Sequence, residues 1–206
     1  KNGKEVAFTQ HEIASAKEIK PGFGVAKISC DGEFAKITGD NFEHIFNMHY
    51  GHIENICGTL TSPMKLSVWR APTDNDRGIK NKWFDENYDK QYNKVYDSRI
   101  EGNKIIVNGA LSTVSRMNFF KYTAVYTFFA DGRIDVTVDG EFDNTRTFLP
   151  RLGFEFKTAE KKFEYFGYGP YESYIDMHHG SKMGMYNSSA EDEYVNYIKP
   201  QEHGNH

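Results

Sequence analysis

The strongest structural constraint in this sequence is a β-hairpin pattern in its centre. Residues 122–130 are rich in β-branched and aromatic side chains, Asp131-Gly132 follows, and residues 133–142 largely alternate apolar and polar side chains. Asp-Gly between two such segments favours a two-residue type I′ turn, because both central positions need positive φ. That register predicts three cross-strand pairs on one face. They are Phe129 with Ile134, Thr127 with Val136, and Val125 with Val138.

Further strand candidates lie on both sides of this hairpin. They are short β-branched or aromatic segments bounded by Gly, Asn or Lys: residues 34–38, 44–46, 104–107, 149–156 and 163–166. The first two are expected to form a hairpin around Gly39-Asp40-Asn41. Regularly spaced strands separated by turn residues predict an antiparallel sandwich or barrel, so the expected fold class is all-β.

Two other segments carry helical signals. Residues 81–93 place aromatic side chains at helical spacing and predict one short amphipathic helix. Near the start, Thr9 and Glu12 match a capping box, but residues 5–13 also alternate as in a strand, which we favour. Lys20-Pro21-Gly22 then indicates a boundary between a terminal segment and the main domain.

Composition and charge exclude several classes of protein. The 206 residues carry a net charge of −4 and no dense basic run, which argues against nucleic-acid binding. The longest apolar runs fall short of the ~18 residues that a membrane span needs. With no apolar leader at the start, we expect a cytoplasmic chain. Cys30 and Cys57 lack the spacing of a zinc knuckle, and a bridge between them is left open.

The first polar motif, W-R-A-P-T-D-N-D-R-G, spans residues 69–78. Its carboxylates and amide could bind sugar hydroxyls or a cation. A structural interpretation is favoured, because Asp and Asn side chains accept hydrogen bonds from backbone N–H groups in turns. Arg70 and Arg77 can neutralise Asp74 and Asp76, so we expect a rigid, hydrogen-bonded turn.

The second motif, Y-F-G-Y-G-P-Y-E-S-Y-I-D, spans residues 165–176. Its tyrosines could stack against sugar rings while Glu172 and Asp176 accept hydroxyl groups. An aromatic-packed rigid loop explains the same residues equally well. Both interpretations are therefore open for this motif.

Histidines and clustered carboxylates give weaker signals. His178-His179, His49-x-x-His52 and His203-x-x-His206 were considered as metal ligands, but glycines interrupt the spaced pairs and no third ligand is identifiable. Hydrogen-bonded or surface histidines are favoured, and no metal is expected. A glycosidase usually needs two carboxyl groups roughly 5–5.5 Å apart (retaining) or roughly 6.5–9.5 Å apart (inverting). Neither Asp74 with Asp76 nor residues 191–193 establish that geometry from sequence.

Three motifs in one order carry a family resemblance. The motifs at 69–78 and 165–176, followed by Y-I-K-P-Q-E-H-G-N-H at 197–206, resemble the C-terminal small-chain β-sandwich domain of glycoside hydrolase family two β-galactosidases. The resemblance implies an antiparallel galactose-mutarotase-like supersandwich over residues 21–206, truncated at its C-terminal end. Residues 1–20 resemble the last strand of a preceding immunoglobulin-like linker domain.

The resemblance also implies a function for the parent protein. Such enzymes cleave terminal β-D-galactosyl residues with retention, using two glutamates and a magnesium site in a (β/α)₈ barrel that nothing here matches. We therefore expect a non-catalytic scaffold without a cofactor, inactive alone, forming a wall of the sugar pocket. Expected partners are the parent's other domains, its galactoside substrate and further copies in a homo-oligomer. Candidate sugar-contacting residues are Tyr171, Glu172, Asp176, Glu202 and His203.

Two alternatives belong to different functional classes. A stand-alone sugar-binding or aldose-epimerase-like protein on the same fold would need a histidine and a carboxylate in one cleft as acid and base. Its candidate residues are His178, His179, Glu172 and Asp176. A purely structural module would instead pack its exposed aromatic side chains against partner domains. Fold analogy alone does not separate these functions.

Overall fold

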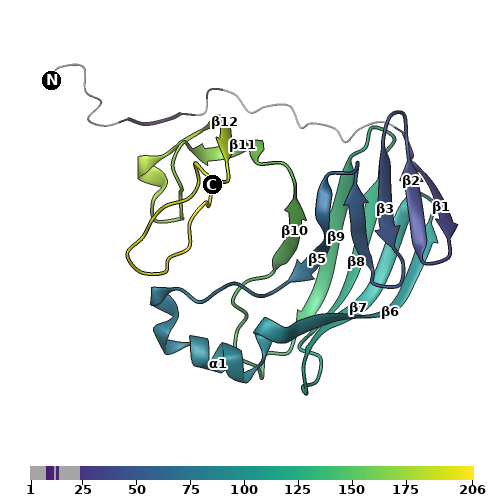
Figure 1. Cartoon of the computed structure of the whole chain (residues 1–206), viewed down its shortest axis with the longest axis horizontal. Helices are drawn as coiled ribbons and strands as arrows, with labels where there is room; N and C mark the ends of the chain where they lie inside the picture. The colour runs from purple at the N-terminus through teal and green to yellow at the C-terminus, as the bar shows by residue number, and fades with distance from the viewer. Residues whose placement is uncertain (1–7, 12, 14–23) are drawn as a thin grey trace. The chain divides into compact units, whose positions relative to one another are not determined.

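The computed structural model describes residues 8–11, 13 and 24–206. The chain divides into two compact units, one within residues 21–159 and the other formed by residues 160–206 with the first twenty residues (Figure 1). We call them the sandwich unit and the C-terminal unit and describe each by itself. The predicted domain boundary at residues 20 and 21 lies outside the described residues and stays a prediction.

The sandwich unit contains two antiparallel sheets (Figure 1). The six-stranded sheet has the order β1-β2-β3-β4-β5-β10, with β1 Lys27–Asp31, β2 Phe34–Thr38, β3 Glu43–Asn47, β4 His52–Ile56, β5 Leu60–Ser67 and β10 Gly153–Thr158. The four-stranded sheet has the order β6-β7-β8-β9, with β6 Gln91–Glu101, β7 Lys104–Thr113, β8 Phe120–Phe128 and β9 Ile134–Phe142. The all-β antiparallel sandwich predicted from the sequence is confirmed.

The core of this unit lies between the inner faces of the two sheets. Along β8 every second side chain from Phe120 to Phe128 is buried, as the two-residue period of a strand requires. The rings of Phe46 on β3 and Tyr126 on β8 meet edge to face with centroids 4.9 Å apart. Burying each large apolar side chain contributes roughly 1.5–3 kcal/mol, so this interface contributes strongly to the stability of the unit.

The β8–β9 hairpin is confirmed, but its predicted turn and register are wrong. Phe128, not Phe129, pairs with Ile134, and Gly132 has a φ of 91°. Gly132 N–H donates to the Phe129 carbonyl at 3.1 Å, and Phe129 N–H donates to the Arg133 carbonyl at 3.0 Å. These bonds close a three-residue loop of the kind in which a left-handed glycine follows a turn. A one-residue slip exchanges the faces of a strand, and the observed register places Phe128 in the core beside Ile134.

The predicted helix over residues 81–93 is too long. The chain forms the 3₁₀ turn η1 Asp74–Gly78, the helix α1 Lys80–Asp85 and the 3₁₀ turn η2 Tyr88–Lys90, and then enters β6. Asn87, with a left-handed φ of 59°, ends the helical path. The Gln91 side chain accepts from Val68 N–H at 2.8 Å and donates to the Leu66 carbonyl at 3.1 Å, which fixes the start of β6.

The remaining strand predictions have mixed outcomes. Residues 34–38, 44–46, 104–107 and 163–166 lie in strands, and β2 and β3 form the hairpin expected around residues 39–41. The strand predicted at 149–156 begins only at Gly153, since the residues before it run past α1, where Trp83 Nε1 donates to the Phe148 carbonyl at 2.9 Å. The strand predicted over residues 5–13 falls partly outside the described residues, and residues 8–11 are irregular.

The C-terminal unit is built on a two-stranded antiparallel sheet. Strand β11 Lys162–Gly169 pairs with β12 Lys182–Ser189, and the 3₁₀ turn η3 His178–Gly180 leads into β12. Beyond Ser189 the chain has turns and irregular structure but no further strand. Among the residues that the structure describes, no helix is long and apolar enough to cross a membrane.

Candidate functional site

In the first motif, the hydrogen bonds converge on the carboxylate of Asp76. Asp76 is only 7% exposed, and its two oxygens accept from the Arg70 guanidinium at 2.5 and 3.0 Å. Asp76 Oδ2 also accepts from Thr73 N–H at 2.7 Å and from the Thr73 hydroxyl at 3.0 Å. The guanidinium, with help from Thr73 and against the effect of burial, lowers the pKa of Asp76 to about 2.

The same segment contains a second, looser ion pair. Arg77 Nε lies 3.7 Å from Asp74 Oδ1, with the arginine side chain 73% exposed. Arg70 also lies over the Trp83 ring, 5.2 Å from its centroid, which ties the motif to α1. Residues 69–78 therefore form the hydrogen-bonded turn that the sequence predicted, with each carboxylate facing an arginine.

The second and third motifs lie against each other in the C-terminal unit. Ser173 N–H donates to the Asn205 carbonyl at 2.7 Å, and the Asn205 side-chain amide donates to the Ser173 carbonyl at 2.6 Å. Glu172 accepts hydrogen bonds from the Tyr197 hydroxyl and, at 3.3 Å, from Gly204 N–H. Residues 197–206 thus fold back onto residues 165–176 through backbone and side-chain bonds.

A histidine and a glutamate that were not predicted as a pair complete this contact. His206 Nε2 lies 2.7 Å from Glu193 Oε2, and His206 Nδ1 donates to the Tyr168 carbonyl at 3.1 Å. The imidazole also lies against Tyr165, with ring centroids 4.1 Å apart. In the sequence, His206 stands out only as part of the spaced pair with His203, and Glu193 only as part of the acidic run at residues 191–193. No local pattern connects positions thirteen residues apart in an irregular segment.

The predicted sugar-contacting residues are not all brought together. Glu172 is half-buried, and its carboxylate accepts a hydrogen bond from Gly204 N–H. The neighbouring His203 donates from Nδ1 to the Glu193 carbonyl at 3.1 Å. Tyr171 is 75% exposed, and Asp176 and Glu202 are exposed as well. Glu172 therefore contacts the third motif, to which His203 itself belongs, and the other four candidates are exposed.

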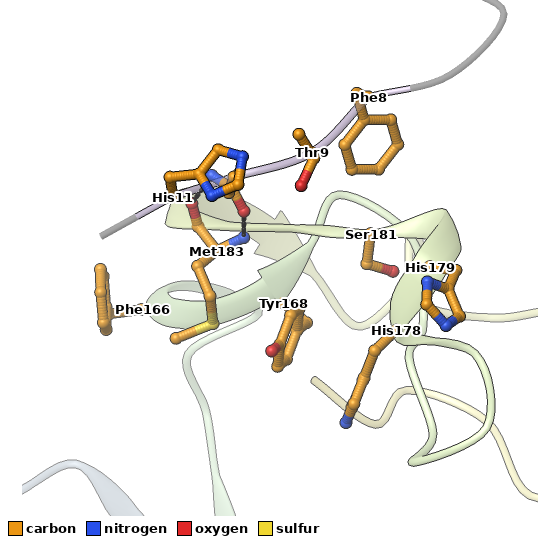
Figure 2. A pocket seen from close by; sticks show the side chains of 10 residues that line it. Phe8, Thr9, His11, Phe166, Tyr168, His178, His179, Ser181 and Met183 are labelled. Carbon is orange, nitrogen blue, oxygen red and sulfur yellow. Dashed lines mark hydrogen bonds between the residues drawn. The ribbon is translucent and has the colours of Figure 1, made fainter. Parts of the chain in front are cut away.

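A pocket of about 760 Å³ lies in the C-terminal unit (Figure 2). Its described lining residues are Phe8, Thr9, Gln10, His11, Phe166, Tyr168, His178, His179, Ser181 and Met183. The His178 ring stacks on Tyr168 with centroids 4.1 Å apart, and its Nδ1 lies 2.9 Å from the buried Ser173 hydroxyl. Glu172 and Asp176 are not among these lining residues.

The described N-terminal residues form one side of this pocket. The Gln10 side-chain amide donates to the Met183 carbonyl at 3.0 Å, and its oxygen accepts from Met183 N–H at 2.6 Å, shown as dashed lines in Figure 2. Lys182 Nζ lies over the Phe8 ring, 4.4 Å from the centroid. These contacts satisfy backbone groups at the outer edge of β12.

Four of the histidines considered as metal ligands, His52, His178, His203 and His206, have hydrogen-bond partners. His52 Nε2 lies 3.1 Å from Glu54, and burial lowers the pKa of His52 in opposition to that carboxylate. His178, His203 and His206 form the hydrogen bonds given above. In the described part of the chain, no group of three or more His, Cys, Asp or Glu side chains is arranged to hold a metal ion.

The two sheets define the sandwich unit as a β-sandwich, and the polar side chains of the three motifs form hydrogen bonds mainly within their own unit. Residues 38–206 match the family described as beta galactosidase small chain, and the chain belongs to that family. It is 37% identical to a β-galactosidase of Actinobacillus pleuropneumoniae over 71% of this chain and 15% of that protein. It is 28% identical to a β-galactosidase of Kluyveromyces lactis over the whole of this chain and 22% of that protein. The chain thus spans about a fifth or less of these relatives.

Proposed function

We propose that this chain is a non-catalytic domain of a β-galactosidase that hydrolyses terminal β-D-galactosyl residues with retention. The observation that carries the proposal is the family match over residues 38–206, within relatives that are β-galactosidases. The parent's two catalytic glutamates and its magnesium ion belong to a barrel domain outside this sequence. Asp74 and Asp76, which face arginines here, do not offer a site for that ion.

In this proposal the sandwich unit is a scaffold, and the C-terminal unit contributes a wall to the parent's sugar pocket. Support comes from the contacts of two glutamates: Glu172 and Glu193 accept hydrogen bonds from residues of the third motif and hold it in place. The loop so held carries exposed side chains, among them Tyr171. Such a surface suits contacts with the parent's other domains and with its galactoside. A mutarotase-like completion of the sandwich, a homo-oligomer and a cytoplasmic location belong to the same proposal.

Two assays test this proposal. The purified chain should not hydrolyse a chromogenic β-galactoside, and turnover proportional to its concentration would overturn the non-catalytic role. In the second assay, two variants of the Actinobacillus pleuropneumoniae enzyme are made: in one the matching segment is deleted, and in the other it is replaced by this chain. Deletion should abolish turnover and replacement should restore part of it. A deletion variant with full activity would show that the segment is no scaffold.

A second candidate function has one observation in its favour. His178 and His179, the histidines that an aldose epimerase would use, line the same pocket as Tyr168 and Ser181. The carboxylates proposed with them, Glu172 and Asp176, do not line it. Sugar binding without epimerisation therefore fits this pocket better. Galactose binding is tested by titrating the chain with galactose while NMR monitors the resonances of the histidine rings. A saturable change in chemical shift that is lost in His179→Ala supports binding, and the absence of any change contradicts it.

A further inference from the structure

The turn between β4 and β5 places a cysteine in an unusual backbone conformation. Cys57 and Gly58 are its central residues, with φ values of 51° and 76°, and Thr59 N–H donates to the Ile56 carbonyl at 2.9 Å. Two positive φ values are the pattern of a type I′ turn, in which Asn, Asp or Gly normally takes the first central position. Cys57 is exposed and unbridged, so reagents in solution can reach its thiol.

A buried imidazole lies beside this thiol. Cys57 Sγ is 3.6 Å from Nδ1 of His44, a residue of β3 that is only 1% exposed. The other ring nitrogen, Nε2, is 2.9 Å from the Gly132 carbonyl in the β8–β9 loop. The ring also packs against Phe42, with centroids 4.5 Å apart. These contacts fix the position and the plane of the imidazole.

The Gly132 contact also determines which nitrogen carries hydrogen. A carbonyl oxygen can only accept, so Nε2 must donate in that bond. In the neutral imidazole Nδ1 is then the acceptor, and the nearby donor is the Cys57 thiol. A nucleophile next to a base, with that base oriented by a third group, is the arrangement that activates thiols in proteins.

We propose that Cys57 is a nucleophilic thiol, activated by His44, that forms mixed disulfides with low-molecular-weight disulfides. The inference is independent of the glycosidase assignment, since it uses only the geometry around Cys57 and His44. It assigns a modification site to the β4–β5 turn and gives the buried His44 a chemical role. The ligand class is a small disulfide such as oxidised glutathione.

The exchange is balanced without any further oxidant. The Cys57 sulfur attacks one sulfur of the disulfide, a new S–S bond forms, and the original S–S bond breaks. His44 Nδ1 takes the thiol proton as the sulfur attacks, and that proton then passes to the departing thiolate. The products are one mixed disulfide at Cys57 and one small-molecule thiol.

Cys30 provides a matched control within the same sheet. It is also exposed and unbridged, but its Sγ contacts the Gly32 carbonyl, at 3.6 Å, in place of an imidazole. Cys30→Ser leaves only Cys57, and Cys57→Ser leaves only Cys30. Each variant is treated with oxidised glutathione at pH 7, and the mass of the intact protein is followed over time. We expect Cys57 to react roughly tenfold faster than Cys30. This is less than a positioned base usually contributes, because a free thiol is already a few per cent thiolate at pH 7.

Unfolding separates the effect of His44 from that of the local sequence. In concentrated guanidinium chloride the pair is broken, and the two single-cysteine variants should react at similar rates. His44→Gln in the Cys30→Ser background should lower the folded rate to that of Cys30. Equal folded rates for both cysteines, or an advantage of Cys57 that persists in guanidinium, would overturn the proposal. Because the comparison of folded and unfolded rates needs no His44 variant, it holds even if His44→Gln does not fold.

Discussion

In the sandwich unit, residues 69–78 are held by one buried carboxylate that accepts four hydrogen bonds from Arg70 and Thr73. In the C-terminal unit, residues 165–176 are instead held by several separate contacts with residues 197–206, which are exposed or only partly buried. A concentrated network fails when its central residue is removed, because a buried charge is then left unpaired. Where the contacts are distributed over a surface, removing one of them should leave the others in place and cost little stability.

The largest effect is expected from Asp76→Ala. This variant leaves the Arg70 guanidinium, 19% exposed at its side chain, without its carboxylate. We expect the free energy of unfolding to fall by about 3 kcal/mol, the lower range for breaking a buried ion pair. Trp69 and Trp83 both lie in the sandwich unit, so tryptophan fluorescence during urea denaturation reports on this unit.

Asp74→Ala is the matched control for that experiment. Its partner Arg77 is largely exposed, at 3.7 Å, so the expected loss is below about 1 kcal/mol. Equal losses in the two variants would show that the network is not concentrated on Asp76. Neither variant should alter calorimetric titrations with galactose or divalent cations, because we assign both carboxylates to the structure of the turn.

Acid should remove the same contribution without a mutation. The pKa of Asp76 is lowered from 3.8 to about 2, so its stabilisation is present above pH 4 and is lost as the pH falls toward 2. The shift corresponds to about 2 kcal/mol. Asp76→Asn has no such titration. The stability difference between the wild type and Asp76→Asn should therefore shrink between pH 4 and pH 2, and a constant difference would contradict this assignment.

Gly132→Val probes a backbone constraint in the sandwich unit. Gly132 has a φ of 91°, and an added Cβ would lie 3.2 Å from the Phe42 ring. A β-branched residue is strained there, and we expect a loss of ~1–2 kcal/mol, seen as a lower melting temperature. Thr137→Val, which places the same side chain at an exposed position of β9, is the control and should leave the melting temperature nearly unchanged. An unchanged melting temperature for Gly132→Val would refute the left-handed glycine.

The two hairpin turns show what the sequence could and could not predict. The strands at residues 34–38, 44–46, 104–107 and 163–166 followed from their β-branched and aromatic side chains. Asp131-Gly132 matches a type I′ turn yet closes a longer loop, because packing of Phe128 against the opposite sheet decides the register. Cys57-Gly58 has the two positive φ values although Cys is a poor signal for them. In the β8–β9 loop, tertiary packing overrides the local turn preference.

The candidate site shows the same limit. Sequence motifs identified Glu172 and His203, and the closed turn at 69–78 followed from the pairing of short acidic side chains with arginines. The contacts of His206 with Glu193 and of Ser173 with Asn205 join positions that only the folded chain brings together. No periodic signal marks an irregular segment such as residues 190–206, so its partners could not be predicted.

Glu193→Gln tests the distributed contacts of the C-terminal unit. Glu193 accepts from the Ser188 hydroxyl and lies 2.7 Å from His206 Nε2, and its side chain is 15% exposed. We expect the local opening free energy to fall by about 1 kcal/mol, the usual value for weakening one hydrogen bond. Hydrogen exchange at the Ser173 amide, which donates to Asn205, measures that opening. Glu191→Gln, a carboxylate that is 82% exposed, is the control and should leave the exchange rate unchanged.

The smallest effect is expected from Tyr197→Phe. This variant removes the hydroxyl that donates to Glu172 but leaves the Gly204 N–H bond to the same carboxylate, so the third motif keeps one of its two anchors there. Hydrogen bonding to Glu172 also raises the pKa of Tyr197, so the absorbance titration of the tyrosines should lose one component above the ordinary tyrosine range in the variant. Exchange at the Ser173 amide should accelerate by a factor of about three or less, equivalent to about 0.6 kcal/mol. A loss as large as that of Asp76→Ala would mean that the C-terminal unit, too, depends on a single contact.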